Sequence, residues 1–167
     1  ATNALLTHTG IARTALITNF GFRDVLEIGR QQRPQLYNLY TQRPRSLVKR
    51  ENRFTVHGRI CASGEEFESL DLNEAQQVAQ TIVNEVYESI AIVFLNSYKN
   101  NSHEKRMKKI LLNMKFGGTI SCSSEVNREY KEYERMSTTV VNAVLSPLMS
   151  KYLRNLKKRL HHTGFEA

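Results

Sequence analysis

The densest group of side chains able to do chemistry lies near the carboxyl end of the sequence, where hydroxyl and amide residues follow an arginine. These residues are Arg135, Ser137, Thr138, Thr139 and Asn142. Ser and Thr are poor choices inside a helix, because their side chains compete with the backbone for hydrogen bonds. Either local capping with one turn of side-chain-to-backbone bonding or contact with a ligand explains them, and the sequence leaves both interpretations open.

A second charged group, Asp24, Glu27 and Arg30, recurs at a spacing of three residues within a segment of helical periodicity. This spacing places neighbours on one helix face, so the simpler interpretation is a surface ladder of ion pairs, and a binding site is the alternative. His8 and His57 are kept as further candidates for a site. No two of the five histidines have metal-ligand spacing on one helix face.

Signature motifs for nucleotide and nucleophile chemistry are absent: there is no G-x-G-x-x-G, P-loop, G-x-S-x-G or H-E-x-x-H pattern. Gly117 and Gly118 follow a predicted helix and precede a predicted strand, which is the wrong order for phosphate binding at a helix N-terminus. Cys61 and Cys122 are far apart and form no C-x-x-C pair, which argues against a zinc site or a disulfide framework. The sequence therefore predicts no metal site, and its cysteine usage indicates a reduced, cytoplasmic protein.

The composition is that of a globular domain with a basic surplus. The chain has 167 residues, with 24 Lys and Arg against 16 Asp and Glu, a formal charge of +8, and 40% hydrophobic residues. This balance argues against a disordered tail, and the length fits one domain with or without an appendage. No apolar run reaches the roughly 18 residues of a membrane-spanning helix, and the amino terminus has no secretory signal pattern.

Positive charge is concentrated in three clusters, at residues 30–53, 105–109 and 151–159. Such clusters can neutralise phosphates, but the sequence matches no zinc finger, basic zipper or RNP pattern, so no specific nucleic-acid partner is predicted. We interpret the clusters as solvated faces or as surfaces that meet acidic parts of a larger protein.

Hydrophobic periodicity predicts an α/β fold, a mixed sheet with helices packed on it. Strands are predicted for four short runs: 12–18, 53–60, 90–95 and 119–123. Helices are predicted for four segments: 22–30, 72–87, 102–114 and 130–160. A capping box at residues 71–74 begins the second helix, and Pro147 is expected to kink or divide the last one. Residues 33–53 are predicted to be an irregular excursion with one helical turn at 35–40.

Several of these segments, taken in order, resemble the A subunit of the hydantoinase/oxoprolinase family. The resemblance begins at residues 2–6 and 13–18, and is most specific at residues 21–31, Gly-Phe-Arg-Asp-Val-Leu-Glu-Ile-Gly-Arg-Gln. It returns at residues 123–126, 132–135 and 137–143, the last reading Ser-Thr-Thr-Val-Val-Asn-Ala. The resemblance therefore covers essentially the whole chain.

The resemblance implies a large cytoplasmic protein with an actin/sugar-kinase-like ATPase architecture. Members of this family couple ATP hydrolysis to the opening of cyclic amides such as hydantoins or 5-oxoproline, and related members carboxylate ketones. Because amide resonance resists attack by water, ATP with Mg²⁺ is expected to activate the ring carbonyl in the parent protein. The expected partners are a hydantoinase B-type subunit or domain and the remainder of the A subunit, with no membrane.

The sequence departs from the family at its ends: the acidic D-x-G-G-T motif is absent, and the chain starts inside a later His-Gly-Thr-Thr segment. We therefore expect an internal piece of the A subunit. Residues 1–129 would belong to its N-terminal domain and residues 130–167 would be the helical start of the following hydantoinase A domain. Most ATP-binding parts would lie outside the piece, which is then expected to hold no cofactor and to be inactive alone.

No nucleophile or base is assigned, and the ring that is opened stays undecided. The candidates are hydroxyl and amide groups that would position phosphate or substrate, and charged groups beside them that would offset developing charge. They are Thr2, Asn3, Arg23, Asp24, Arg30, Arg135, Ser137, Thr138, Thr139 and Asn142. Two alternatives remain: a non-catalytic domain that docks a partner subunit, and a basic nucleic-acid-binding module.

Overall fold

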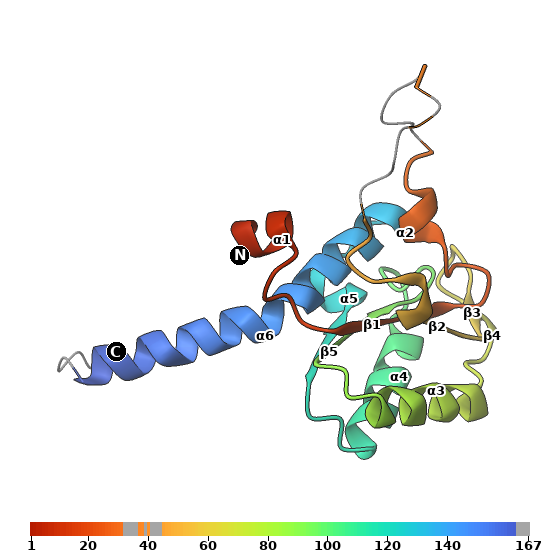
Figure 1. Cartoon of the computed structure of the whole chain (residues 1–167). Helices are drawn as coiled ribbons and strands as arrows, with labels where there is room; N and C mark the ends of the chain where they lie inside the picture. Colours follow the sequence, from red (N-terminus) through yellow and green to blue (C-terminus); the bar gives the residue numbers. More distant parts are fainter. Residues whose placement is uncertain (32–36, 39, 41–44, 163–167) are drawn as a thin grey trace.

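A computed structural model describes residues 1–31, 37–38, 40 and 45–162, and it shows helices on both faces of a sheet (Figure 1). The central sheet is parallel, in the order β2-β1-β5-β6. Its strands are β1 (Thr14–Asn19), β2 (Arg53–Val56), β5 (Ser89–Val93) and β6 (Thr119–Cys122). A separate antiparallel ribbon pairs β3 (Arg59–Ile60) with β4 (Glu66–Glu68). The predicted α/β fold is confirmed, and its antiparallel pairing lies in the ribbon.

The two central strands are buried along their whole length, as their apolar sequences predict. They pair in register from Thr14 opposite Ser89 to Thr18 opposite Val93. Successive side chains point to opposite faces of the sheet, because strand side chains alternate with a period of two. Each face of the sheet therefore has its own apolar cluster.

Two groups of helices cover these clusters (Figure 1). One face packs against α3 (Leu72–Asn84) and α4 (Ser102–Asn113). The other packs against the first half of α6 (Glu132–His162), with α1 (Thr2–Thr7) and α2 (Val25–Ile28) beside it. Two short elements complete the fold: η1 (Arg50–Asn52) and α5 (Ser123–Val126).

Several predicted boundaries differ from the observed ones. The helix predicted at 22–30 is reduced to α2, and the strand predicted at 53–60 is divided into β2 and β3. Gly58 lies at this break with φ 139°, and a Cβ there would come within 2.9 Å of the Leu70 Cα, so the turn requires glycine. Residues 35, 36 and 39, half of the helical turn predicted at 35–40, lie outside the described residues.

Half of the predicted capping box is confirmed. The Asp71 side chain accepts hydrogen bonds from the backbone N–H groups of Asn73 and Glu74, and so caps α3. The Glu74 carboxylate does not return to Asp71, because it accepts from the backbone N–H and the ring Nδ1 of His57 instead. The helix start is therefore tied to the segment that follows β2.

The long helix α6 is not divided at Pro147, which lies inside it. Proline removes the backbone N–H that would bond the carbonyl four residues earlier. In the same turn, the Val144 carbonyl accepts a hydrogen bond from the Ala12 backbone N–H at 3.0 Å. The proline turn is thus where the segment leading into β1 is attached to the helix.

A fully buried carboxylate, Glu104, joins α4 to the carboxyl ends of β5 and β6. It accepts hydrogen bonds from the hydroxyls of Ser97, Ser123 and Ser124 at 2.9, 2.6 and 2.6 Å. The backbone N–H groups of Ser124 and Phe94 also donate to it. Within the described residues no cation lies within ion-pair distance of this carboxylate, so these dipoles alone replace its hydration.

We predict that Glu104→Ala lowers the free energy of unfolding by about 3–5 kcal/mol, because several buried donors lose their acceptor together. Urea denaturation measures the change. The matched control is Glu125→Ala, which removes an exposed carboxylate that pairs with Lys108 at 2.8 Å, and which should cost less than about 1 kcal/mol. Equal losses for the two variants would contradict the proposed role of the Glu104 network.

Candidate functional site

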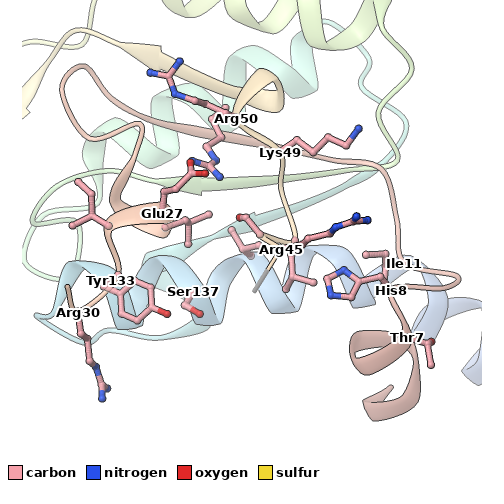
Figure 2. Close-up of a pocket in the computed structure, with 17 residues that line it drawn as sticks. Thr7, His8, Ile11, Glu27, Arg30, Arg45, Lys49, Arg50, Tyr133 and Ser137 are labelled. Carbon is pink, nitrogen blue, oxygen red and sulfur yellow. The ribbon is translucent and has the colours of Figure 1, made fainter. Parts of the chain in front are cut away.

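A cavity of about 1270 Å³ opens between α6, α2, the segment 45–53 and the end of α1 (Figure 2). We call it the cationic cavity, because five Arg and Lys side chains line it, Arg30, Arg45, Lys49, Arg50 and Arg53, together with the candidate His8. Its acidic lining residue within the described chain is Glu27. The Tyr133 and Ser137 side chains face it from α6 (Figure 2).

The buried Arg53 guanidinium organises one wall of this cavity. Its Nε and Nη2 atoms both donate to the Val48 carbonyl, at 3.1 and 3.0 Å, and Nη1 donates to the Glu27 carboxylate at 2.7 Å. The side chain is only 1% exposed. Arg53 therefore fixes segment 45–53 against α2, with geometry that a flexible lysine would not reproduce.

Asp24 and Arg50 form a two-pronged ion pair beside this wall. Arg50 Nε and Nη2 donate to the two carboxylate oxygens at 2.9 and 3.1 Å. This hydrogen bond is the main reason why the pKa of Asp24 lies below its ordinary value, and it raises the pKa of Arg50. Arg23 reaches the same place, since its Nη2 donates to the Arg50 carbonyl, while its Nε is buried without a partner in the described structure.

The surface ladder predicted for Asp24, Glu27 and Arg30 is wrong. Asp24 pairs with Arg50, Glu27 with Arg53, and Arg30 with Glu134 on α6 at 2.8 Å. The ladder fails because α2 has only four residues, too few to keep one face exposed. These charges instead tie α2 to segment 45–53 and to α6.

Most of the cavity's positive charge is therefore already neutralised. Lys49 lies 3.5 Å from the Glu51 carboxylate, so four of the five cations have an acidic partner. Arg45 is exposed and has no carboxylate partner within the described residues. Arg45 lines the same cavity as Ser137 and Tyr133, and a cation without a carboxylate partner is suited to one anionic group, a carboxylate or a phosphate.

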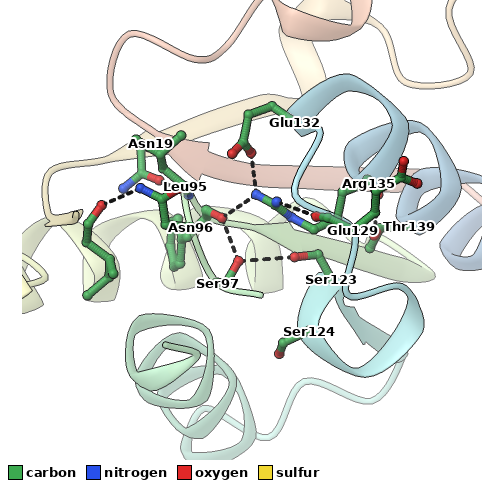
Figure 3. A network of polar contacts seen from close by, with 12 residues as sticks. Asn19, Leu95, Asn96, Ser97, Ser123, Ser124, Glu129, Glu132, Arg135 and Thr139 are labelled. Carbon is green, nitrogen blue, oxygen red and sulfur yellow. Dashed lines mark hydrogen bonds and ion pairs between the residues drawn. The ribbon is translucent and has the colours of Figure 1, made fainter. Parts of the chain in front are cut away.

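The predicted polar stretch on α6 divides between two faces of that helix. Ser137 faces the cavity, whereas Arg135 is completely buried on another side (Figures 2 and 3). Arg135 donates to the carbonyls of Phe94 and Glu129 at 2.9 Å and is bonded to the Glu132 carboxylate. It is thus a structural link to β5, out of reach of the cavity.

The other residues of that stretch serve local contacts. Thr139 is buried and donates to the Arg135 carbonyl at 2.7 Å, which is the local bonding considered as one interpretation. Asn142 donates to the Ser121 hydroxyl at 2.9 Å, and Thr138 is exposed. Thr2 and Asn3 are exposed on α1 and do not line the cavity.

Sequence reasoning missed the role of Asn19 at the end of the sheet. It ends β1, next to β5, where the connections of the parallel sheet change direction, the usual ligand position in open α/β sheets. Its Oδ1 accepts from the Leu95 N–H at 2.6 Å and its Nδ2 donates to the Gly58 carbonyl at 2.5 Å. The amide therefore clamps the ends of three strands together. The available signal was a polar residue directly after a buried apolar run.

His57 lies beside this clamp, stacked on Phe20 with ring centroids 4.4 Å apart. The hydrogen bond to Glu74 raises the pKa of His57, and the His57 backbone and ring in turn lower the pKa of Glu74. The stabilisation from charged His57 is complete below the unfolded histidine pKa of about 6.5 and is lost as pH rises through the higher folded value. That from ionised Glu74 is present above about 4.3 and is lost as pH falls through its lowered folded value.

We predict that an NMR pH titration gives His57 a raised pKa in the native chain and a lower pKa in Glu74→Gln. The neutral amide still accepts from the backbone but no longer favours the charged ring. Glu68→Gln is the control, because Glu68 acts on His57 only through space and as a smaller influence. An unchanged His57 titration in Glu74→Gln would exclude the pair as the cause.

No group of three or more His, Cys, Asp or Glu side chains within the described ranges can hold a metal ion. None of the helices in the described part of the chain is long and apolar enough to cross a membrane. The basic lining of the cavity and its hydroxyl groups are thus the chemistry that this site offers.

Comparison with known proteins identifies the family to which the chain belongs. Residues 1–115 match the hydantoinase/oxoprolinase N-terminal region, so the chain is a member of the hydantoinase/oxoprolinase family, as predicted. An uncharacterized protein of Methanocaldococcus jannaschii is 47% identical over 160 residues, which cover 96% of this chain and 24% of the relative. The caprolactamase subunit alpha of Pseudomonas jessenii is 33% identical over 98% of this chain and 24% of its own length.

The three-dimensional likeness is also extensive. The crystal structure of the ATP-dependent caprolactamase from Pseudomonas jessenii superposes with a TM-score of 0.91 and 30% identity, over 99% of this chain and 24% of that one. The chain thus spans about a quarter of the length of these relatives. The fold described above is therefore shared with this caprolactamase.

We predict that inorganic phosphate binds in the cationic cavity and shifts the NMR signals of Arg45 and Ser137. Arg45→Gln should weaken this binding about fivefold, which is the roughly 1 kcal/mol expected for one exposed charge pair. Asp24→Asn should strengthen it, because Arg50 then loses its competing carboxylate. Arg59→Gln is the matched control on the ribbon, and equal affinities for all these proteins would contradict the site.

Proposed function

We propose that this chain is part of an ATP-dependent hydrolase that opens small cyclic amides, and that it contributes to the binding site of that enzyme. The supporting observation is the match to the ATP-dependent caprolactamase, which covers 99% of this chain with a TM-score of 0.91 and 30% identity. The family description adds hydantoinases and oxoprolinases, so a lactam or a related five-membered ring is the proposed substrate class. ATP would supply the activation that makes the ring carbonyl open to water.

Within this enzyme we assign the cationic cavity a positioning role. Arg45, Lys49 and the Ser137 hydroxyl would hold one anionic group, a phosphate of the nucleotide or a carboxylate of the substrate or product. Arg53 and Asp24 would keep the cavity wall in place through the bonds described above. The described residues fit an anion but contain no carboxylate cluster for Mg²⁺, so its ligands would come from other polypeptide.

The proposal extends to the assembly. Residues 1–129 would form part of the N-terminal domain of an actin/sugar-kinase-like architecture, and residues 130–167 would lead into the following hydantoinase A domain. The first half of α6 nevertheless packs on this sheet, so the two parts would share that helix. A B-type subunit is the proposed partner, and the cytoplasm is the proposed location.

We predict that this chain can replace the corresponding quarter of the Pseudomonas jessenii caprolactamase subunit alpha, with ATP-dependent opening of caprolactam retained. Chromatography of the ring-opened product and release of phosphate measure the activity. Arg45→Gln in the hybrid should raise the KM for ATP or for the ring substrate several-fold, whereas the matched Arg59→Gln should leave both unchanged. The isolated chain should open no ring and hydrolyse no ATP.

A hybrid that is soluble, shows the native circular dichroism and still lacks ATP-dependent turnover would contradict the proposed function. Metal-dependent turnover by the isolated chain would contradict the proposal that the metal ligands and most of the ATP-binding residues lie in polypeptide outside this chain.

A further inference from the structure

The second half of α6 leaves the body of the domain (Figure 1). Met136, Val140, Ala143 and Val144 in its first half are buried against the sheet. All residues from 150 to 161 are exposed instead. Most of the stability of a protein helix comes from packing of an apolar face, and within the described part of the chain residues 150–161 are not buried against the sheet as the first half is.

The exposed half carries bulky apolar side chains along one side. They are Tyr152, Leu153, Leu156 and Leu160, with exposed fractions of 58, 56, 39 and 40%, and we call them the leucine seam. At 100° per residue these four positions fall within an arc of about 100°, the width of a helix face that packs on a partner. The steps from Leu153 to Leu156 and on to Leu160 are those of a helix seam that fits a groove.

The rest of this half is strongly basic. Lys151, Arg154, Lys157 and Lys158 lie outside the seam, and the sequence contains no Asp or Glu between Arg135 and Glu166. None of these four cations has an ion-pair partner in the part of the chain that the structure describes. Like charges three and four residues apart destabilise a helix, so a partner with negative charge would relieve repulsion while it covers the seam.

We propose that the leucine seam is a docking surface for an apolar groove with an acidic rim, supplied by polypeptide outside these 167 residues. This is the helix-in-groove mode of recognition, in which apolar anchors give affinity and charges at the rim give orientation. The relatives provide the additional polypeptide, since they are about four times as long as this chain. The inference goes beyond the proposed function and does not depend on it.

Two other occupants fit the charges less well. A second copy of this chain, paired about a two-fold axis, would oppose the same cations to each other. A lipid surface favours amphipathic helices with a larger apolar face that often includes Trp or Phe, and residues 150–161 contain neither. An acidic protein groove satisfies both the seam and its basic borders.

The test measures binding of a labelled synthetic helical peptide to the whole chain by fluorescence anisotropy. The peptide has about six helical turns, leucines at the a and d positions and glutamates at the flanking positions. We expect micromolar binding that weakens at least tenfold in the variant Leu153→Gln with Leu156→Gln. Leu112→Gln on α4 is the matched control, because Leu112 is 56% exposed, like Leu153, and it should bind as the native chain does.

A peptide with lysines in place of the glutamates should not bind, and added salt should weaken the acidic peptide, because ionic strength screens exposed charges. Equal binding by the seam variant and the Leu112 control would overturn the proposal. Failure of the acidic peptide to bind would also overturn it. Preferential binding of the chain to phosphatidylglycerol vesicles would favour a lipid surface instead, and dimerisation in sedimentation that Leu153→Gln abolishes would favour a second copy; either result would overturn the proposal. Circular dichroism of each variant confirms that the helix is intact.

Discussion

The carboxyl end of β5 is the point at which both helical layers are attached to the sheet. The Phe94 carbonyl accepts hydrogen bonds from Arg135 of α6 at 2.9 Å and from the Ser97 hydroxyl at 2.5 Å. The Ser97 Oγ also lies 2.9 Å from the Glu104 carboxylate of α4, so the two acceptors share its one proton. Arg135 and Glu104 are both completely buried, and a buried charge is tolerated only when hydrogen bonds replace its hydration. The network therefore fixes α4 and α6 relative to one strand end. Figure 3 shows the part of the network that contains Arg135 and Ser97.

The position of α6 decides what the cationic cavity contains. Arg135 is bonded to the Phe94 carbonyl at the end of β5. Because two residues of a helix are separated by a rotation of 200°, Ser137 lies on the opposite side of α6. There it joins the arginines of segment 45–53. The same helix presents one face to a buried polar network and another to a cavity rich in charge. One short polar stretch thus has a buried side chain at Arg135 and a cavity-lining side chain at Ser137.

The basic side chains that exceed the acidic ones have different surroundings in different parts of the chain. Around the cavity their charge is largely absorbed by Asp24, Glu27 and Glu134, whose pairs lock α2 between its neighbours. The second half of α6 itself contains no Asp or Glu, and its charges border exposed leucines. Clusters of similar composition therefore join neighbouring elements around the cavity, whereas along the second half of α6 they lie on an exposed helix.

Local sequence patterns were sufficient to predict the order and type of the main helices and strands, the helix cap at Asp71 and the family of the protein. Apolar runs such as residues 90–95 and helical stripes such as 72–87 depend only on neighbours in sequence. The tertiary structure alone decided the partner of each charged side chain. Arg30 meets Glu134 across 104 positions and Glu74 is drawn from its helix cap to His57. The physical reason is that periodicity sets which face a side chain occupies, whereas its partner depends on which distant element packs against that face.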